Sequence, residues 1–254
     1  MRRPELPAGG LWTEVRLVAQ TGSTNADLAA AARAGAAEGL VLVAEHQTAG
    51  RGRAGRGWSS PPRAGLAVSV LLRPAVATTR WGWLPLLAGV ALAGSVTRVT
   101  GLAEVRLKWP NDLLVGGAKA AGILAEVAGA AVVLGVGLNV TQRAGELPAG
   151  ATSLALAGVP GPDREALLAG LLADLADWYG RWQDAGGDAD RAGLRVAYRS
   201  RSATIGSRVR VRLPDGAELA GTADTVDHDG RLVLRTGTGV RSLAAGDVTH
   251  LRRA

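Results

Sequence analysis

The chain has 254 residues, of which 47% are apolar and 20% are charged, a composition typical of a globular protein with one large domain or one large and one small domain. The absence of cysteine excludes a disulfide framework, a thiol nucleophile and any cysteine metal site. The net charge of +7 admits a nucleic acid or a nucleotide as partner. Residues 46–103 contain no acidic residue and account for the excess. Such a local cationic site suits a nucleotide triphosphate at least as well as a DNA backbone.

The first part of the chain is predicted to alternate helices and strands. Ser23 is a typical N-cap for a short helix that ends near Gly35. The apolar stretch 81–96 is shorter than the roughly 20 residues that span a bilayer, so it predicts a buried helix instead. No apolar signal segment follows Met1, and we expect a cytoplasmic protein without a membrane partner. In chain order the pattern predicts a strand at 40–44, a mobile glycine-rich loop at 46–63, a strand at 65–72 and a helix at 81–99.

The remainder predicts the rest of a sheet and a second, smaller unit. Gly116 and Gly117 are a hairpin signal between two strands. Further strands are predicted at 104–109, 113–115, 123–127 and 132–140, and helices at 163–183 and 190–198. From residue 203 short alternating strands at 208–213, 219–223, 232–235 and 239–243 predict a small β-barrel. The sequence therefore predicts an α+β protein with a mixed sheet in a domain of residues 1–202 and a barrel of residues 203–254.

The loop Gly50-Arg51-Gly52-Arg53-Ala54-Gly55-Arg56-Gly57-Trp58 combines backbone freedom with positive charge. Glycines let main-chain N–H groups approach phosphate oxygens, and guanidinium groups bind phosphate or carboxylate with two hydrogen bonds. Trp58 is a candidate for stacking on adenine. A disordered basic turn and an RNA-binding patch remain alternatives for this segment.

Rare residue types mark two further segments. The chain has two lysines and three asparagines, all within the first 140 residues. Lys108, Asn111 and Asp112 flank a Trp-Pro pair that restrains the backbone, although a plain strand-end turn would also explain them. Lys119 follows the predicted hairpin, where a lysine also protects an edge strand. A compact ammonium group between two anions is the other explanation of Lys119.

Together these segments resemble biotin protein ligases. The loop at 50–58, Lys-Trp-Pro-Asn-Asp at 108–112, Lys119 with Gly-Ile-Leu at 122–124, Gly-Val-Gly-Leu-Asn at 135–139 and Ser-Thr-Asn at 23–25 occur in that family's order and approximate spacing. The resemblance implies a class II synthetase-like catalytic domain followed by an SH3-like barrel. It also implies a two-step reaction, in which biotin and ATP with Mg²⁺ form biotinyl-5'-adenylate, and a lysine of a carboxylase's biotin carboxyl carrier domain then takes the biotin.

The resemblance further implies roles for individual residues. Lys119, Arg53 and Arg56 are expected to be catalytic. The expected biotin contacts are Ser23, Thr24, Asn25, Gln47, Gly50, Arg51, Gly52, Lys119, Gly122 and Ile123. The expected ATP contacts are Arg53, Arg56, Trp58, Lys108, Asn111, Asp112, Lys119, Asn139 and Arg252. No metal ligand is identified, and the three histidines lack metal-ligand spacing.

Two departures from the family pattern are visible. Ala54 stands where members often have arginine, which leaves one fewer cation in the loop. Roughly 20 residues precede the first motif, which is too few for the winged helix-turn-helix domain of repressor members, so we expect no sequence-specific DNA binding. Two other functions stay open: a lipoate protein ligase-like acyl-adenylate transferase, and a nucleic-acid-binding protein that uses the Gly/Arg loop.

Overall fold

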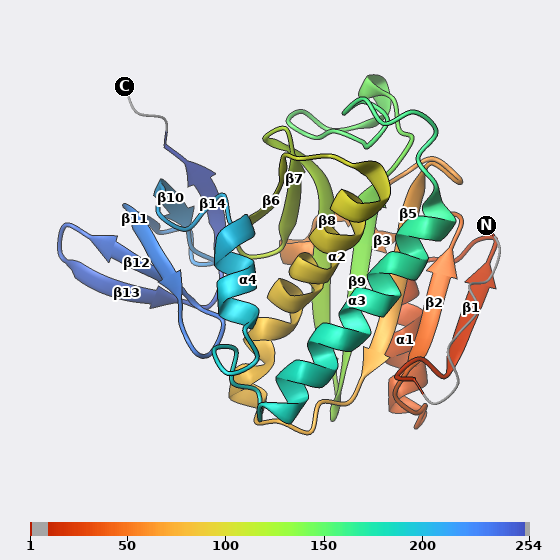
Figure 1. Ribbon diagram of the computed structural model, residues 1–254, viewed down its shortest axis with the longest axis horizontal. Coiled ribbons are helices and arrows are strands. Elements are labelled where there is room, and N and C mark those ends of the chain that lie inside the picture. Colours follow the sequence, from red (N-terminus) through yellow and green to blue (C-terminus); the bar gives the residue numbers. More distant parts are fainter. Residues whose placement is uncertain (2–9, 252–254) are drawn as a thin grey trace.

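A seven-stranded mixed sheet organises the larger part of the molecule. The computed structural model describes residue 1 and residues 10–251. The strands lie in the order β1-β2-β5-β9-β8-β7-β6, with β1 and β2 parallel and the other pairs antiparallel (Figure 1). Their bounds are β1 (Glu14–Val18), β2 (Leu40–Ala44), β5 (Gly65–Leu72), β6 (Val105–Lys108), β7 (Asp112–Val115), β8 (Ala118–Ala128) and β9 (Ala131–Asn139). The expected mixed sheet is thus confirmed.

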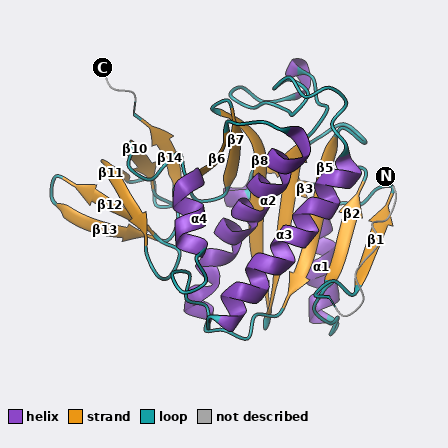
Figure 2. Cartoon of the chain, viewed as in Figure 1, coloured by secondary structure: helices purple, strands orange, loops and turns teal. Residues whose placement is uncertain are grey.

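Helices cover both faces of this sheet (Figure 2). On one face lie α2 (Leu84–Thr100), α3 (Arg164–Asp184) and α4 (Leu194–Arg201), and on the other lies α1 (Thr24–Arg33). Alternate strand residues point to opposite faces, so Val41 and Val43 pack into the core under α2 and α3, whereas Leu40 and Leu42 pack under α1. Two apolar cores therefore share the central strands, and both faces of the sheet are occupied.

Local sequence signals explain where the helices begin. The Ser23 hydroxyl caps α1 by accepting a hydrogen bond from the Ala26 N–H, as expected from the sequence. Asp163 caps α3, and Pro85 lies in the first turn of α2 after the 3₁₀ turn η2 (Thr78–Trp83). Residues 78–100 are long and apolar enough to cross a membrane, but most of this segment is buried inside the protein. It is the central core helix of the larger unit.

The C-terminal part forms a separate five-stranded antiparallel sheet that resembles a small barrel. Its order is β13-β12-β11-β10-β14, and its bounds are β10 (Arg208–Arg212), β11 (Glu218–Val226), β12 (Leu232–Thr236), β13 (Gly239–Leu243) and β14 (Asp247–His250). The turn between β11 and β12 packs on the larger unit, because the Trp83 indole donates to the Asp227 carbonyl and the Trp109 indole donates to the Gly230 carbonyl. These contacts fix where the barrel lies relative to the sheet.

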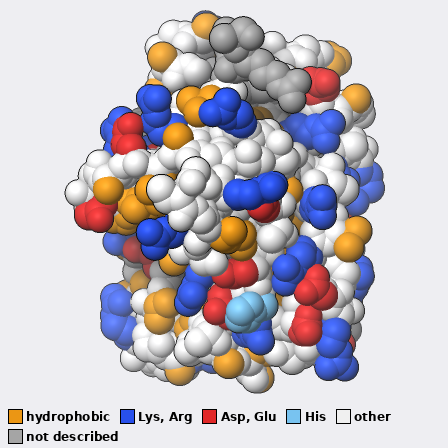
Figure 3. All heavy atoms as spheres, turned by 90° about the vertical axis from the view of Figure 1, so that its left-hand side faces the viewer, with side chains coloured by type: hydrophobic (Ala, Val, Ile, Leu, Met, Phe, Trp, Pro, Cys, Tyr) orange, Lys and Arg blue, Asp and Glu red, His pale blue; other side chains and the backbone are white. Residues whose placement is uncertain are grey.

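Charged side chains of both signs are spread over the face that carries the barrel (Figure 3). Several are paired across neighbouring strands, as Arg235 is with Asp224 and Arg212 with Glu218. Among the described residues of this face, basic and acidic side chains are therefore mixed, whereas a nucleic acid backbone would favour a continuous basic surface.

The structure differs from the sequence expectations in four places. The helix expected at 190–198 begins only at Leu194, because Gly193 adopts a left-handed conformation and residues 188–193 form turns. The loop at 46–63 is not wholly irregular, since β3 (Gly50–Arg51) pairs with β4 (Gly57–Trp58) around the 3₁₀ turn η1 (Arg53–Gly55). The short strands β1 and β14 are absent from the sequence prediction, although Glu14-Val15-Arg16-Leu17 of β1 alternates polar and apolar residues.

Candidate functional site

A cavity of about 640 Å³ opens on the α1 side of the sheet. That volume is in the range of pockets that hold a small molecule or a cofactor. The residues that line it come from the start of α1, the loop between β2 and β5, strands β8 and β9, and the segment after β9. They are Ser23, Thr24, Asn25, Gln47, Arg51, Gly52, Arg53, Arg56, Gly57, Trp58, Ser59, Val68, Asn111, Lys119, Gly122, Ile123, Leu124, Gly135, Val136, Gly137, Asn139, Glu146, Leu147, Pro148 and Ala151.

Three glycines make room for the cavity on β8 and β9. A Cβ atom on Gly137 would overlap the Trp58 ring, and one on Gly135 would overlap the Asn25 amide. Gly122, opposite Gly137 in the sheet, would bring a Cβ within 3.3 Å of Trp58. On β9 the glycines alternate with Leu134, Val136 and Leu138, which pack into the core on the other face. The Gly-Val-Gly-Leu pattern therefore gives one apolar face and one open face.

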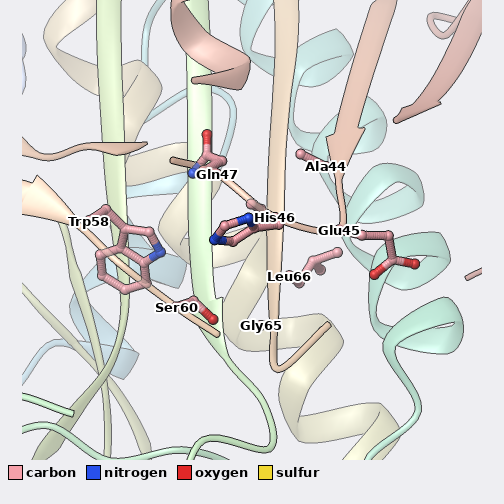
Figure 4. Close-up of a pocket in the computed structure, with 9 residues that line it drawn as sticks. Ala44, Glu45, His46, Gln47, Trp58, Ser60, Gly65 and Leu66 are labelled. Atoms are coloured by element: carbon pink, nitrogen blue, oxygen red, sulfur yellow. The ribbon is translucent and has the colours of Figure 1, made fainter. Parts of the chain in front are cut away.

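The loop of residues 50–58, hereafter the ligand loop, lies over this glycine floor. The paired strands β3 and β4 of this loop place Trp58 against Gly122 and Gly137. The Gly50 backbone packs against Trp58 and Gln47. Figure 4 shows Gln47, His46 and Trp58 near one another, whereas Glu45 lies beside α3. The small cavity drawn there adjoins the large one, because Gln47 and Trp58 line both.

One end of the cavity is polar, neutral and buried. The Gln47 side-chain oxygen accepts hydrogen bonds from the Thr24 N–H at 2.8 Å and from the Thr24 hydroxyl at 3.0 Å. The Asn25 amide donates to Glu126 at 2.7 Å and to the Leu124 carbonyl at 3.3 Å. We call Ser23, Thr24, Asn25 and Gln47 the polar end. Its groups are held in fixed orientations by partners on three different elements.

The other end carries Arg53 and Arg56, whereas Arg51 pairs at 3.3 Å with Glu126, the partner of Asn25. Arg53 donates to the Asn111 side-chain oxygen at 3.3 Å and to the Gly246 carbonyl of the barrel at 3.4 Å, and its burial lowers its pKa. Arg56 forms an ion pair of 2.9 Å with Asp247, also in the barrel. We call Arg53, Arg56 and Asn111 the cationic end. The ligand loop therefore rests against the C-terminal unit.

Lys119 lines the same cavity as the two ends. Its ammonium nitrogen is 2.6 Å from Asp112 Oδ1, and it lies beside Gly122 on the cavity floor. A register shift in the pairing of β7 with β8 falls next to Lys119, and its backbone bonds to Gly150 and Thr152 of the segment after β9. The Asn139 amide donates to the Thr152 carbonyl of this segment, so Asn139 lies in the same wall of the cavity as Lys119.

Most of the residues expected at the site come together here, and three of the described ones do not line the cavity. The Gly50 backbone packs against the Trp58 backbone. Asp112 contacts Lys119, which lines the cavity, through their ion pair. Lys108 lies on β6 away from the cavity, where its charge adds to burial in lowering the pKa of His250. Arg252 lies outside the described residues.

The motifs found in the sequence do not include all of the residues that form the cavity wall. Glu146, Leu147, Pro148 and Ala151 close the cavity from the segment after β9, and Val68 contributes from β5. The expected motifs contain none of them, because each belongs to ordinary loop or strand sequence. The glycines at 135 and 137 carried a usable signal, since glycine recurs at every second residue of a buried strand.

No three acidic or histidine side chains come together among residues 1 and 10–251 in a way that could hold a metal ion. Glu146 is the acidic residue among those lining the cavity. The site therefore offers one carboxylate, together with Asp112 behind Lys119.

Comparisons with known proteins agree with this geometry. Residues 18–141 match the model of the biotin/lipoate A/B protein ligase family, and residues 204–251 match the biotin protein ligase C-terminal domain. A biotin--[acetyl-CoA-carboxylase] ligase of Mycobacterium tuberculosis is 50% identical over 99% of this chain and 94% of its own length. The bifunctional ligase/repressor BirA of Bacillus subtilis is 32% identical over 84% of this chain and 66% of its own.

Solved structures extend the likeness to bound ligands. A biotin protein ligase from Aquifex aeolicus in complex with biotin and ATP has a TM-score of 0.78 and 25% identity, covering 95% of this chain and all of its own. A biotin protein ligase from Leishmania major in complex with biotinyl-5-AMP has a TM-score of 0.63 and 27% identity, covering 91% and 99%. The fold, the motifs and the full-length relative agree, and this chain belongs to the biotin protein ligase family.

Proposed function

We propose that this chain joins biotin and ATP into biotinyl-5'-adenylate and then transfers the biotin to a lysine of a biotin carboxyl carrier domain. One observation carries this function: the Lys119 ammonium lines a single cavity together with a neutral polar end and a cationic end. A reaction between a carboxylate and a triphosphate needs positive charge where the two anions meet. The relatives that bind biotin, ATP or the adenylate support the same conclusion.

The polar end is proposed to hold biotin. The ring system of biotin carries a urea group with N–H donors and a carbonyl acceptor. Ser23, Thr24 and Gln47 offer matching neutral groups. Gly52, Gly122 and Ile123 would line the apolar part, with Asn25 and Arg51 beside them. Gly50 would act through Gln47, which its backbone contacts.

The cationic end is proposed to hold ATP. Arg53, Arg56 and Asn111 would contact phosphates, and Trp58 and Asn139 would lie on the nucleoside side. Asp112 would orient Lys119 through their ion pair. Arg252 stays a prediction, and Lys108 would act at longer range through its charge.

In the first step a biotin carboxylate oxygen attacks the α-phosphorus, and pyrophosphate leaves. Lys119 would contact both the carboxylate and the α-phosphate, so that their repulsion falls and the charge on the phosphorus centre is stabilised. In the second step a carrier lysine amine attacks the carbonyl carbon, and AMP leaves. The ligand loop would exclude water, which otherwise hydrolyses the mixed anhydride.

Magnesium is expected to enter with ATP. Mg²⁺ is commonly held by one or two carboxylates together with substrate phosphates and water. Glu146 is the carboxylate placed to contribute, so the phosphates would supply most of the ligands. The ion would neutralise phosphate charge while the arginines and Lys119 orient the reacting groups.

The decisive experiment is biotin-dependent exchange of label between pyrophosphate and ATP. We expect exchange with biotin and none with lipoate, followed by transfer of labelled biotin to a purified carrier domain. Exchange that depends on lipoate would favour the lipoate ligase alternative. Binding of DNA at physiological salt, with no need for ATP, would favour the nucleic acid alternative. We expect no sequence-specific DNA binding and no membrane partner.

We also propose how the chain divides. The catalytic domain would end near residue 202, where α4 stops and the Ala203 N–H bonds back to the Leu107 carbonyl of β6. The barrel of residues 203–254 would brace the ligand loop through Gly246 and Asp247. The carboxylase partner and the need for ATP support a cytoplasmic location.

A further inference from the structure

A buried serine lies directly behind the polar end. Ser69 is in the middle of β5, with 0% of its surface exposed, among the apolar residues of that strand. It does not line the cavity. A hydroxyl placed among apolar side chains is costly unless it is hydrogen-bonded, so its partners indicate why it is there.

Both side-chain partners of Ser69 belong to the polar end. Its hydroxyl oxygen lies 2.7 Å from the Thr24 hydroxyl oxygen and 2.6 Å from Asn25 Oδ1. Thr24 and Asn25 are themselves 3% and 5% exposed and line the cavity. Ser69 therefore connects the central strand to the first turn of α1 at the place where we put biotin.

The hydrogens of this network can be counted. The Asn25 nitrogen donates to Glu126 and Leu124, so the amide orientation is fixed and its oxygen, which only accepts, faces Ser69. The Thr24 hydroxyl gives its hydrogen to the Gln47 oxygen. Ser69 has one hydrogen for two acceptors, so it donates fully to only one of the Thr24 and Asn25 oxygens at a time. The other oxygen then keeps an unfilled lone pair.

We propose that Ser69 is a positioning residue that orients Thr24 and Asn25 and leaves one acceptor at the polar end without its full share of hydrogens. The inference rests on the proposed function and deepens it. A pocket whose buried oxygens outnumber their hydrogens selects a ligand that brings N–H donors, because a ligand without them leaves a buried acceptor unpaired. The urea of biotin brings two such donors, and Ser69 sets this preference without touching the ligand.

The test compares Ser69→Ala with Ser95→Ala by calorimetric titration of biotin and by steady-state exchange kinetics. Ser95 is a matched control, since it is also 0% exposed, its hydroxyl bonds to the Leu167 carbonyl of α3, and neither residue lines the cavity. We expect Ser69→Ala to weaken biotin binding about tenfold and to leave the KM for ATP within about twofold, because the lost bond orients the polar end alone. Ser95→Ala should lower the melting temperature and leave both constants unchanged.

Ser69→Cys keeps the size of the side chain with a weak donor and carries the test should Ser69→Ala fail to fold. It should weaken biotin binding about threefold or more, and Ser69→Thr, which keeps the hydroxyl, should restore binding to within about threefold of wild type. A Ser69 variant that folds and binds biotin like wild type, or that raises the KM for ATP as much as that for biotin, would overturn the inference. Failure of the wild-type protein to bind biotin would instead overturn the proposed function.

Discussion

The two ends of the cavity are built in different ways. At the polar end Thr24 and Asn25 are almost fully buried and are held by hydrogen bonds to Gln47, Ser69, Leu124 and the Glu126 carboxylate. At the cationic end Arg56 is 58% exposed, and its partner Asp247 is 54% exposed. Buried hydrogen bonds hold a fixed shape, whereas exposed ion pairs are weak and exchangeable. In the proposed function, this difference would let the polar end hold biotin while the ligand loop opens for ATP and for the carrier lysine.

The largest expected effect lies between the two ends. Lys119→Ala should reduce the exchange rate about a hundredfold to a thousandfold, because a preorganised charge at the reacting centre is lost. Lys119→Arg should also be impaired, since a planar guanidinium does not replace a compact ammonium. Unchanged melting curves are the control for folding. An exchange rate within about threefold of wild type would remove Lys119 from the mechanism.

A side chain added to the glycine floor of Gly122, Gly135 and Gly137 should have the next largest effect on activity. Gly137→Ala forces Trp58 off β9, and overpacking of about 1–3 kcal/mol corresponds to roughly a tenfold to hundredfold loss in kcat/KM. Tryptophan fluorescence should report the displaced ring. Gly180→Ala on α3 is the matched control, because an added Cβ there meets no atom within 4 Å. Equal activity of the two variants would show that Trp58 does not need this floor.

Bound ligands should protect the ligand loop from cleavage by trypsin. Arg51, Arg53 and Arg56 are trypsin sites, and three of the four glycines at 50–57 stay free of helix, so we expect cleavage here first in the ligand-free protein. Biotin with ATP should slow cleavage about tenfold or more as phosphates replace carboxylates on the arginines. Equal rates in a sample shown to bind both ligands would mean that the loop is not a lid.

The contact between the loop and the barrel should give the smallest effect. Asp247→Asn removes the partner of Arg56, and an exposed ion pair contributes little, so cleavage of the ligand-free loop should rise only about twofold to fivefold. High salt should abolish the difference between the variant and wild type. The matched control is Asp224→Asn, which breaks the pair with Arg235 elsewhere in the barrel. A similar rise in that variant would show a general loosening of the barrel.

Much of this architecture could be predicted because local signals were strong. Ser23 and Asp163 cap their helices, Pro85 opens α2, and the two glycines after Val115 turn the hairpin as expected. The loop ribbon was missed because its pairing depends on Trp58 meeting the glycine floor, which is a contact between distant segments.

The site was predictable where residues are rare and carry their chemistry with them, as Lys119 and Asn111 do. Ser69 and Asp247 have ordinary sequence surroundings, and their importance arises only from partners 44 or more residues away. Lys108 differs from both, because its motif predicted a contact with ATP, whereas its place on β6 leaves it outside the lining of the cavity.

The most direct test of the two-ended site measures the KM values for biotin and for ATP in the exchange reaction of Thr24→Val and Arg56→Ala. Thr24→Val removes one hydroxyl at the polar end, and Arg56→Ala removes one charge at the cationic end. We expect the first to raise the KM for biotin about tenfold and to leave that for ATP within about twofold, and the second to do the reverse. Variants that each raised both KM values equally would contradict the division of the cavity into a biotin end and an ATP end.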